Sequence, residues 1–182
     1  PIGVIPVYGR SADNLRDHRH VTSLLHRIQT TEYGVEVKPV LSFDERGHQK
    51  NNTTYFVYGS AENGEKPESF YPTVEAFIGE GGTFLNPEAV RTNKPGKTAG
   101  TKIQGKEAVG GLRFSRKTLK PKEAAGYILL SGTTKTSDSI ALLTSGCRTK
   151  LQVQKMLEEV KEHWIQKVNV AFETGNSDVD NY

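Results

Sequence analysis

The pattern of apolar residues changes once along this chain, near Ser137, and this change constrains the fold more than any other feature. Before Ser137, short segments rich in β-branched and aromatic residues are separated by turns containing Gly, Pro and Asp, as in antiparallel sheets. After it, apolar residues recur at steps of three and four, the spacing of one helix face. Strands followed by helices, rather than alternating with them, predict a mainly β fold: an antiparallel β-sandwich followed by a C-terminal linker helix.

The strand signals and the turns between them give the expected order of elements. Strands are expected at 2–8, 21–29, 35–43, 53–60, 108–119 and 124–132. Pro39 lies inside the third of these and indicates an edge strand or a bulge. Lys120 to Glu123 is the expected turn between the last two strands. The segment 86–105 holds two prolines and three glycines, which predicts a long surface loop.

The helical signals are local and specific. Thr149 and Gln152 have the spacing of a capping box, and the helix they begin is expected to end near Val168. Its apolar residues form one stripe that includes Trp164, which we expect to pack on a sheet or on a neighbouring chain. Thr73 is the expected cap of a short helical turn, and a short helix is expected at 139–145. We therefore divide the chain into a β-sandwich at 1–135 and a helical linker at 136–182, and expect both to be a fragment of a larger protein.

Composition excludes several classes of function. The net charge is only +3, and acidic and basic residues are interleaved, which argues against a nucleic-acid-binding face. The apolar runs are too short to cross a membrane. The one cysteine, Cys147, allows no internal disulfide, which fits a reducing, cytoplasmic location.

A polar segment at 10–20 is the main candidate site. Its planar amides, carboxylates and guanidinium groups suit pairs of sugar hydroxyls, and Arg and His also suit phosphate. The candidate substrate-binding residues there are Arg10, Asp13, Asn14, Arg16, Asp17, His18, Arg19 and His20. Two alternatives remain open: a loop whose charges pair with one another, and a metal site using His18 and His20, for which no completing ligands are evident.

Carboxylates elsewhere raise the alternative of a small glycoside hydrolase. Asp44 and Glu45 are adjacent and would point to opposite faces of a strand, so they make a poor acid/base pair with one another. A pair of either residue with Glu80 remains open. Glu80, in a Gly-rich turn, is a further candidate substrate-binding residue. Aromatic residues around that turn are expected either to stack on sugar rings or to lie in the core: Phe70, Tyr71, Phe77 and Phe84.

Several stretches in this order resemble a known family. They are 9–23 (GRSADNLRDHRHVTS), 42–47 (SFDERG), 77–82 (FIGEGG) and 86–90 (NPEAV), followed by a Gly-rich strand at 109–114 and the helix that carries Trp164. Together they are similar to the N-terminal region of glycoside hydrolase family 94, formerly glycosyltransferase family 36, and most similar to the cellobiose and β-1,2-oligoglucan phosphorylase group.

The resemblance implies a galactose-mutarotase-like sandwich, a helical linker and then an (α/α)6 barrel that holds the catalytic aspartate. No catalytic residue, cofactor or metal is expected in this chain, and inorganic phosphate would be the co-substrate of the parent enzyme. The implied partners are a β-glucan oligosaccharide and the barrel, and a homodimer is left open. We therefore expect a non-catalytic carbohydrate-binding and support domain of a glycoside phosphorylase, with a free carbohydrate-binding module as the alternative.

Overall fold

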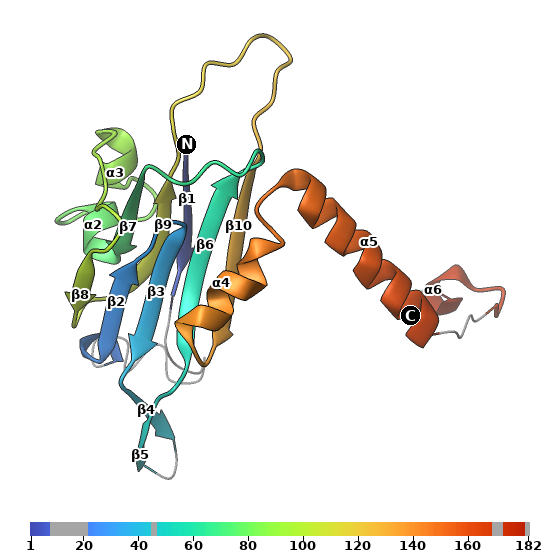
Figure 1. Cartoon of the computed structure of the whole chain (residues 1–182), viewed down its shortest axis with the longest axis horizontal. Helices are drawn as coiled ribbons and strands as arrows, with labels where there is room; N and C mark the ends of the chain where they lie inside the picture. Colours follow the sequence, from blue (N-terminus) through green and yellow to red (C-terminus); the bar gives the residue numbers. More distant parts are fainter. Residues whose placement is uncertain (8–21, 45–46, 169–172, 181–182) are drawn as a thin grey trace.

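The computed structural model describes residues 1–7, 22–44, 47–168 and 173–180, and the ribbon is shown in Figure 1. Two antiparallel sheets and one separate hairpin contain the strands. The three-stranded sheet has the order β1 (Ile2–Pro6), β9 (Ala108–Arg113), β7 (Ser69–Thr73). The five-stranded sheet has the order β10 (Tyr127–Thr134), β6 (Thr54–Ala61), β3 (Gly34–Pro39), β2 (His26–Thr30), β8 (Lys102–Gln104). The hairpin joins β4 (Leu41–Asp44) to β5 (Gly47–Lys50).

The two sheets pack face to face, with β9 and β7 lying against β3, β6 and β2. Their inner faces form the main core, which is apolar because every strand there turns one set of alternating side chains inward. The core residues are Val7, Ile28, Val35, Val37, Val57, Phe70, Ala108, Leu112 and Phe114. This arrangement confirms the predicted antiparallel β-sandwich.

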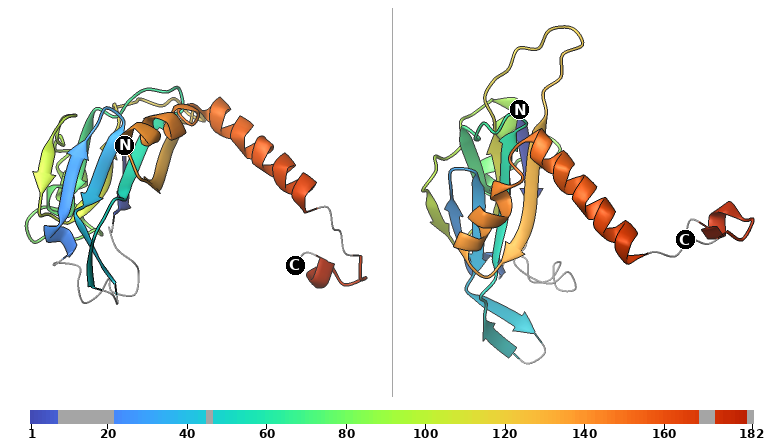
Figure 2. Two further views of the ribbon diagram at one scale, coloured as in Figure 1. Left: turned by 60° about the horizontal axis from the view of Figure 1, so that its bottom comes forward. Right: turned by 45° about the vertical axis from the view of Figure 1, so that its right-hand side comes forward.

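Short helices cover the outer face of each sheet (Figures 1 and 2). The three-stranded sheet is covered by α2 (Val74–Ile78) and α3 (Glu88–Arg91), whose Phe77 and Ala89 pack with Tyr71 and Val109. The five-stranded sheet is covered by α4 (Ser137–Ser145), whose Ile140 is completely buried against Phe56 and Tyr58. The order of layers is therefore helix, sheet, sheet, helix.

The helix α5 (Lys150–Lys167) forms as its capping box predicts, but it does not pack on the sandwich. The Thr149 hydroxyl accepts from Gln152 N, and the helix runs away from the body in all views (Figures 1 and 2). Trp164 is 59% exposed, so the expected packing of its stripe on a sheet of this chain is wrong. Only the start of α5 is fixed, because Ser60 Oγ donates to Arg148 O and Lys150 N donates to Glu62 O. The last described helix is α6 (Ser177–Asp180).

Several strand predictions need correction. β3 lies between β2 and β6, so Pro39 marks the end of a central strand and not an edge. The expected segment 21–29 begins with a helical turn at 22–24 before β2. The expected loop 86–105 contains α3 and β8. β7 was missed, because its five residues are all buried and include Pro72, so they show no alternation.

The connection between β9 and β10 is longer than the predicted turn at 120–123 and joins two different sheets. The two strands were predicted at 108–119 and 124–132, whereas β9 ends at Arg113 and β10 begins at Tyr127. The sequence also predicts a short strand at 170–172, which lies outside the described residues. None of the helices in the described ranges combines the length and apolar character that crossing a bilayer requires.

Candidate functional site

The structure describes only part of the predicted site. Arg10, Asp13, Asn14, Arg16, Asp17, His18, Arg19 and His20 all lie in 8–21, outside the described residues. Glu45 is also outside them, and Asp44 is described by its backbone at the end of β4. Glu80 is described and exposed, and it lines a large open groove.

This groove lies beside the helices that cover the three-stranded sheet, with a volume of about 1520 Å³. Its wall is built from α2, the Gly-rich turn after it, α3, the segment around Lys94 and Lys97, and the chain before β9. The charged residues that line it are Glu75, Glu80, Glu88, Arg91, Lys94, Lys97, Lys106 and Glu107. Polar residues from four separate stretches of sequence therefore meet at one surface.

The Gly-rich turn that carries Glu80 follows from the local sequence. Thr73 caps α2 by accepting a hydrogen bond from Ala76 N, as predicted. The helix ends at Gly79, whose φ of 81° is unfavourable for residues with a Cβ. A Cβ at Gly79 would lie 2.4 Å from Glu88 Oε2, so glycine also allows α3 to pack closely against the turn. Glu80 and Glu88 are in this way brought to the same wall.

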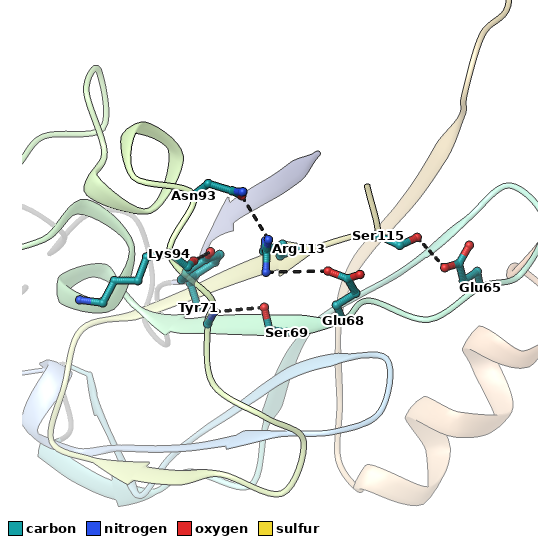
Figure 3. Close-up of polar contacts among 9 residues, drawn as sticks. Glu65, Glu68, Ser69, Tyr71, Asn93, Lys94, Arg113 and Ser115 are labelled. Carbon is teal, nitrogen blue, oxygen red and sulfur yellow. Dashed lines mark hydrogen bonds and ion pairs between the residues drawn. The ribbon is translucent and has the colours of Figure 1, made fainter. Parts of the chain in front are cut away.

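The basic wall of the groove is held by backbone contacts to β7 (Figure 3). Tyr71 donates its hydroxyl hydrogen to Lys94 O, and Ser69 Oγ accepts from Gly96 N at 3.1 Å. Lys97 pairs with Phe70 like an added strand residue, with N to O distances of 2.6 and 2.9 Å. The segment therefore lies along the edge of β7 and presents Lys94 and Lys97 to the groove.

Arg113, on β9, supports this segment from behind (Figure 3). Its guanidinium donates to Asn93 Oδ1 at 3.2 Å and lies 3.8 Å from Glu68 Oε2. Asn93 has a φ of 52°, the left-handed conformation in which Asn is tolerated better than most residues. Arg113 is thus a positioning residue for the turn that precedes Lys94.

The groove carries four basic and four acidic side chains, and only some of them are paired with one another. Lys106 Nζ lies 2.7 Å from Glu75 Oε2, and this hydrogen bond lowers the pKa of Glu75 below its usual value. Lys94 Nζ lies 3.9 Å from Glu88 Oε1. Glu80, Arg91 and Lys97 have no ion-pair partner within the described ranges. These three side chains are available to a hydroxyl-rich ligand, for which mixed charged donors and acceptors are suited.

The aromatic residues near the turn are mostly core. Phe70, Tyr71 and Phe77 are buried, whereas Phe84 is 44% exposed with its ring 6.1 Å from that of Phe77. The other exposed aromatic side chain in the described part of the chain is Trp164, on α5. The two belong to different elements, so the described residues contain no flat aromatic platform of the kind that would favour a free carbohydrate-binding module.

The described residues bear on only part of the catalytic and metal alternatives, because Glu45, His18 and His20 lie outside them. Asp44 is the last residue of β4, and the β4–β5 hairpin projects beyond the sheets (Figure 1). Glu80 follows α2 on the flank of the sandwich. No group of three or more potential His, Cys, Asp or Glu metal ligands occurs within the described ranges. Cys147 is buried, with its Sγ 3.0 Å from Met156 Sδ, and lies away from the groove-lining residues.

Sequence reasoning missed the basic wall. Arg91, Lys94 and Lys97 lie in the segment predicted to be a featureless loop, and only their repeated spacing of three hinted at a shared surface. Their position depends on pairing with β7, which is separated from them by more than 20 residues and was itself not predicted.

The fold and the groove define a β-sandwich domain with helices on both outer faces and a polar surface suited to hydroxyl-rich ligands. A comparison with protein-family models matches residues 12–162 to the supersandwich domain of glycosyl hydrolase 94. The match covers most of the chain, so the chain belongs to the glycosyl hydrolase 94 family, and the family expected from the sequence is confirmed. No curated protein matched the chain.

Proposed function

We propose that this chain is a non-catalytic carbohydrate-binding and support domain of an inverting glycoside phosphorylase acting on β-glucosides or β-glucan oligomers. The observation that carries the proposal is the groove, where Glu80, Arg91 and Lys97 lie on one surface without ion-pair partners among the described residues. Membership of the family supports the parent activity. Within it, the cellobiose and β-1,2-oligoglucan phosphorylase group is the one we propose.

The parent reaction assigns this chain a supporting role. Inorganic phosphate attacks the anomeric carbon, the glycosidic bond breaks, and the leaving oxygen takes a proton from a general acid. We place that acid in the (α/α)6 barrel of the parent and not in this chain. The cytoplasm is the proposed location, and a homodimer of the parent is part of the same proposal.

The segment from Arg10 to His20 is part of this proposal because it precedes a residue that lines the groove. Ser23 lines the groove, and it follows His20 by three residues. Three residues span at most about 10 Å when fully extended. This limit applies only to the His20 end of the segment, since Arg10 precedes Ser23 by 13 residues. We propose that the segment adds to the same binding surface.

The test is a titration of the 182-residue chain with β-1,4- and β-1,2-linked glucose oligomers, in which binding is measured by calorimetry or by NMR. We expect saturable binding that Glu80→Gln and Lys97→Ala each weaken by about ten-fold, since a hydrogen bond to a charged group contributes about 1.5 kcal/mol or more. Lys155→Ala, on the exposed face of α5, is the matched control and is expected to bind normally. Absence of binding at millimolar sugar, or equal affinity in all variants, would contradict the carbohydrate-binding role.

A second assay addresses catalysis. Incubated with the same oligomers and phosphate, the chain is expected to release neither glucose 1-phosphate nor new reducing ends. Turnover that survives purification and disappears in Glu80→Gln would overturn the assignment of a non-catalytic role.

A further inference from the structure

The connection between β9 and β10 forms a projecting arm, residues 115–126, that is separate from the groove. It extends well beyond the ends of the strands (Figure 1, and the right view of Figure 2). Both of its ends are fixed to the same neighbouring segment: Ser115 Oγ donates to Glu65 Oε1 at 2.5 Å, and Gly126 O accepts from Glu62 N at 3.0 Å. The arm is therefore anchored at its base, and its outer part projects away from the sheets (Figure 1).

The end of the arm is an ordered turn. Glu123 N donates to Lys120 O at 3.0 Å, and the Glu123 carboxylate accepts from Lys120 N at 2.8 Å. Pro121 occupies the second position, which suits its fixed φ, and Lys122 follows with a φ of 68°. Glycine or asparagine is the usual residue at that third position, so a lysine there is held in an unfavourable conformation. Backbone conformations of this kind are a reason to look for a function.

The arm is strongly basic. It contains Arg116, Lys117, Lys120 and Lys122 against one acidic residue, Glu123, which gives a net charge of 4 − 1 = +3. Lys117 is engaged with Glu65 and with the Tyr127 ring at the base, and Glu123 is engaged in the turn. Arg116, Lys120 and Lys122 have no ion-pair partner in the part of the chain that the structure describes. The outer arm thus presents three uncompensated cations to an anionic partner.

One apolar side chain distinguishes between kinds of anionic partner. Leu119 is 48% exposed and lies directly beside the turn, between Arg116 and Lys120 in the sequence. Contacts to a polysaccharide sulfate or to a nucleic acid backbone are made through charge, to which Leu119 adds nothing. A protein segment complements both the cations and Leu119, since protein interfaces combine an apolar centre with a polar rim.

We propose that residues 115–126 form a docking arm for an acidic peptide segment, in which Leu119 contacts an apolar side chain and Arg116, Lys120 and Lys122 pair with Asp or Glu residues around it. The ordered turn reduces the conformational entropy lost on binding, since the cations are held apart in advance. The cations also accelerate association, which makes binding sensitive to salt. This inference does not depend on the sugar-binding proposal.

The test selects binders of the 182-residue chain from a displayed library of random dodecapeptides, with heparin as a separate polyanionic probe. We expect the selected peptides to contain two or more acidic residues near a large apolar residue. Their synthetic versions are expected to bind about ten-fold more weakly to Leu119→Ser and several-fold more weakly to Lys122→Gly. Glycine is chosen at position 122 because it removes the charge while it tolerates the positive φ. Lys155→Ala, far from the arm on α5, is the matched control and is expected to bind normally.

Several results would overturn the proposal. Peptides without acidic enrichment would exclude an acidic partner. Acidic peptides that bind Leu119→Ser and Lys122→Gly as tightly as the unaltered chain would place their site elsewhere. Heparin binding that weakens in Lys122→Gly but is unchanged in Leu119→Ser, with no acidic peptide selected, would make the arm a polyanion site instead.

Discussion

A hydrogen-bonded contact between α4 and the five-stranded sheet is the part of the fold that a conservative substitution tests most directly. Glu36, on β3, is 7% exposed, and both of its carboxylate oxygens accept hydrogen bonds. Tyr58 on β6 donates to Oε1 at 2.5 Å, and Ser137 at the start of α4 donates to Oε2 at 2.8 Å. Burial and the hydrogen bond to Glu36 both raise the pKa of Tyr58 above its usual value, so its hydroxyl remains a donor across the pH range in which proteins are handled.

We predict that Tyr58→Phe destabilises the chain by about 2 kcal/mol, because a hydrogen bond to a charged group contributes about 1.5–3 kcal/mol and its loss leaves a buried carboxylate with fewer donors. For a chain of this size the corresponding fall in Tm is about 4–8 °C. Glu36→Gln removes the carboxylate that accepts this hydrogen bond. The double variant Tyr58→Phe, Glu36→Gln is therefore expected to be less destabilised than the sum of the two single variants, with a coupling of about 1 kcal/mol.

The measurement is chemical denaturation followed by circular dichroism, supported by thermal unfolding. Tyr55→Phe is the matched control, since Tyr55 lies on the same strand and its hydroxyl has no hydrogen bond among those found between described residues. It is expected to change stability by less than about 0.5 kcal/mol. Equal effects of the two Tyr→Phe substitutions, or a coupling below about 0.3 kcal/mol, would refute the role assigned to Glu36.

Three further predictions follow from single residues. Burial lowers the pKa of His26 below its usual 6.5, so the contribution of His26 to stability is complete above pH 6.5 and is lost as the pH falls below it. The difference in unfolding free energy between pH 7.5 and pH 5.5 is therefore expected to be smaller in His26→Gln than in the unaltered chain. Trp164→Ala is expected to leave Tm within about 1 °C, because the exposed side chain buries little apolar surface, and a fall of more than 4 °C would mean that α5 packs on the chain in solution. Gly79→Ala is expected to lower the unfolding free energy by about 1 kcal/mol or more and to weaken sugar binding, because the positive φ and the contact with Glu88 both oppose a Cβ. Unchanged denaturation and unchanged binding would contradict this prediction.

Local signals in the sequence were sufficient where the structure depends on neighbours along the chain. Thr149 and Gln152 predicted the start of α5, and Thr73 predicted the start of α2, because a cap is formed by residues within one helical turn. The strand β6 was predicted nearly to its ends from its β-branched and aromatic residues. The overall class followed because strands and helices are separated along the chain.

Other features could not be predicted because they depend on distant partners. β7 is buried on both faces, since α2 and α3 cover one side and the second sheet the other, and this removes the alternation by which strands are found. The strands on either side of the predicted turn at 120–123 belong to different sheets: β9 pairs with β1 and β7, and β10 pairs with β6. Nothing near Lys120 indicates that the chain changes sheet there. The same dependence hid the groove, whose basic wall is placed by Phe70 and Tyr71.

The helix α5 shows how far a local signal determines a structure. Its capping box and its good helix formers make it helical, although most helical stability in proteins comes from the packing of an amphipathic face. Its stripe from Val153 to Trp164 remains exposed, and the contacts with Glu62 and Cys147 involve only its first two turns. A contiguous apolar surface of this kind is uncommon on monomeric proteins and typically marks an interaction site. The periodicity that predicts the helix therefore also predicts that it packs against something, while the identity of that surface depends on a partner that the periodicity does not encode.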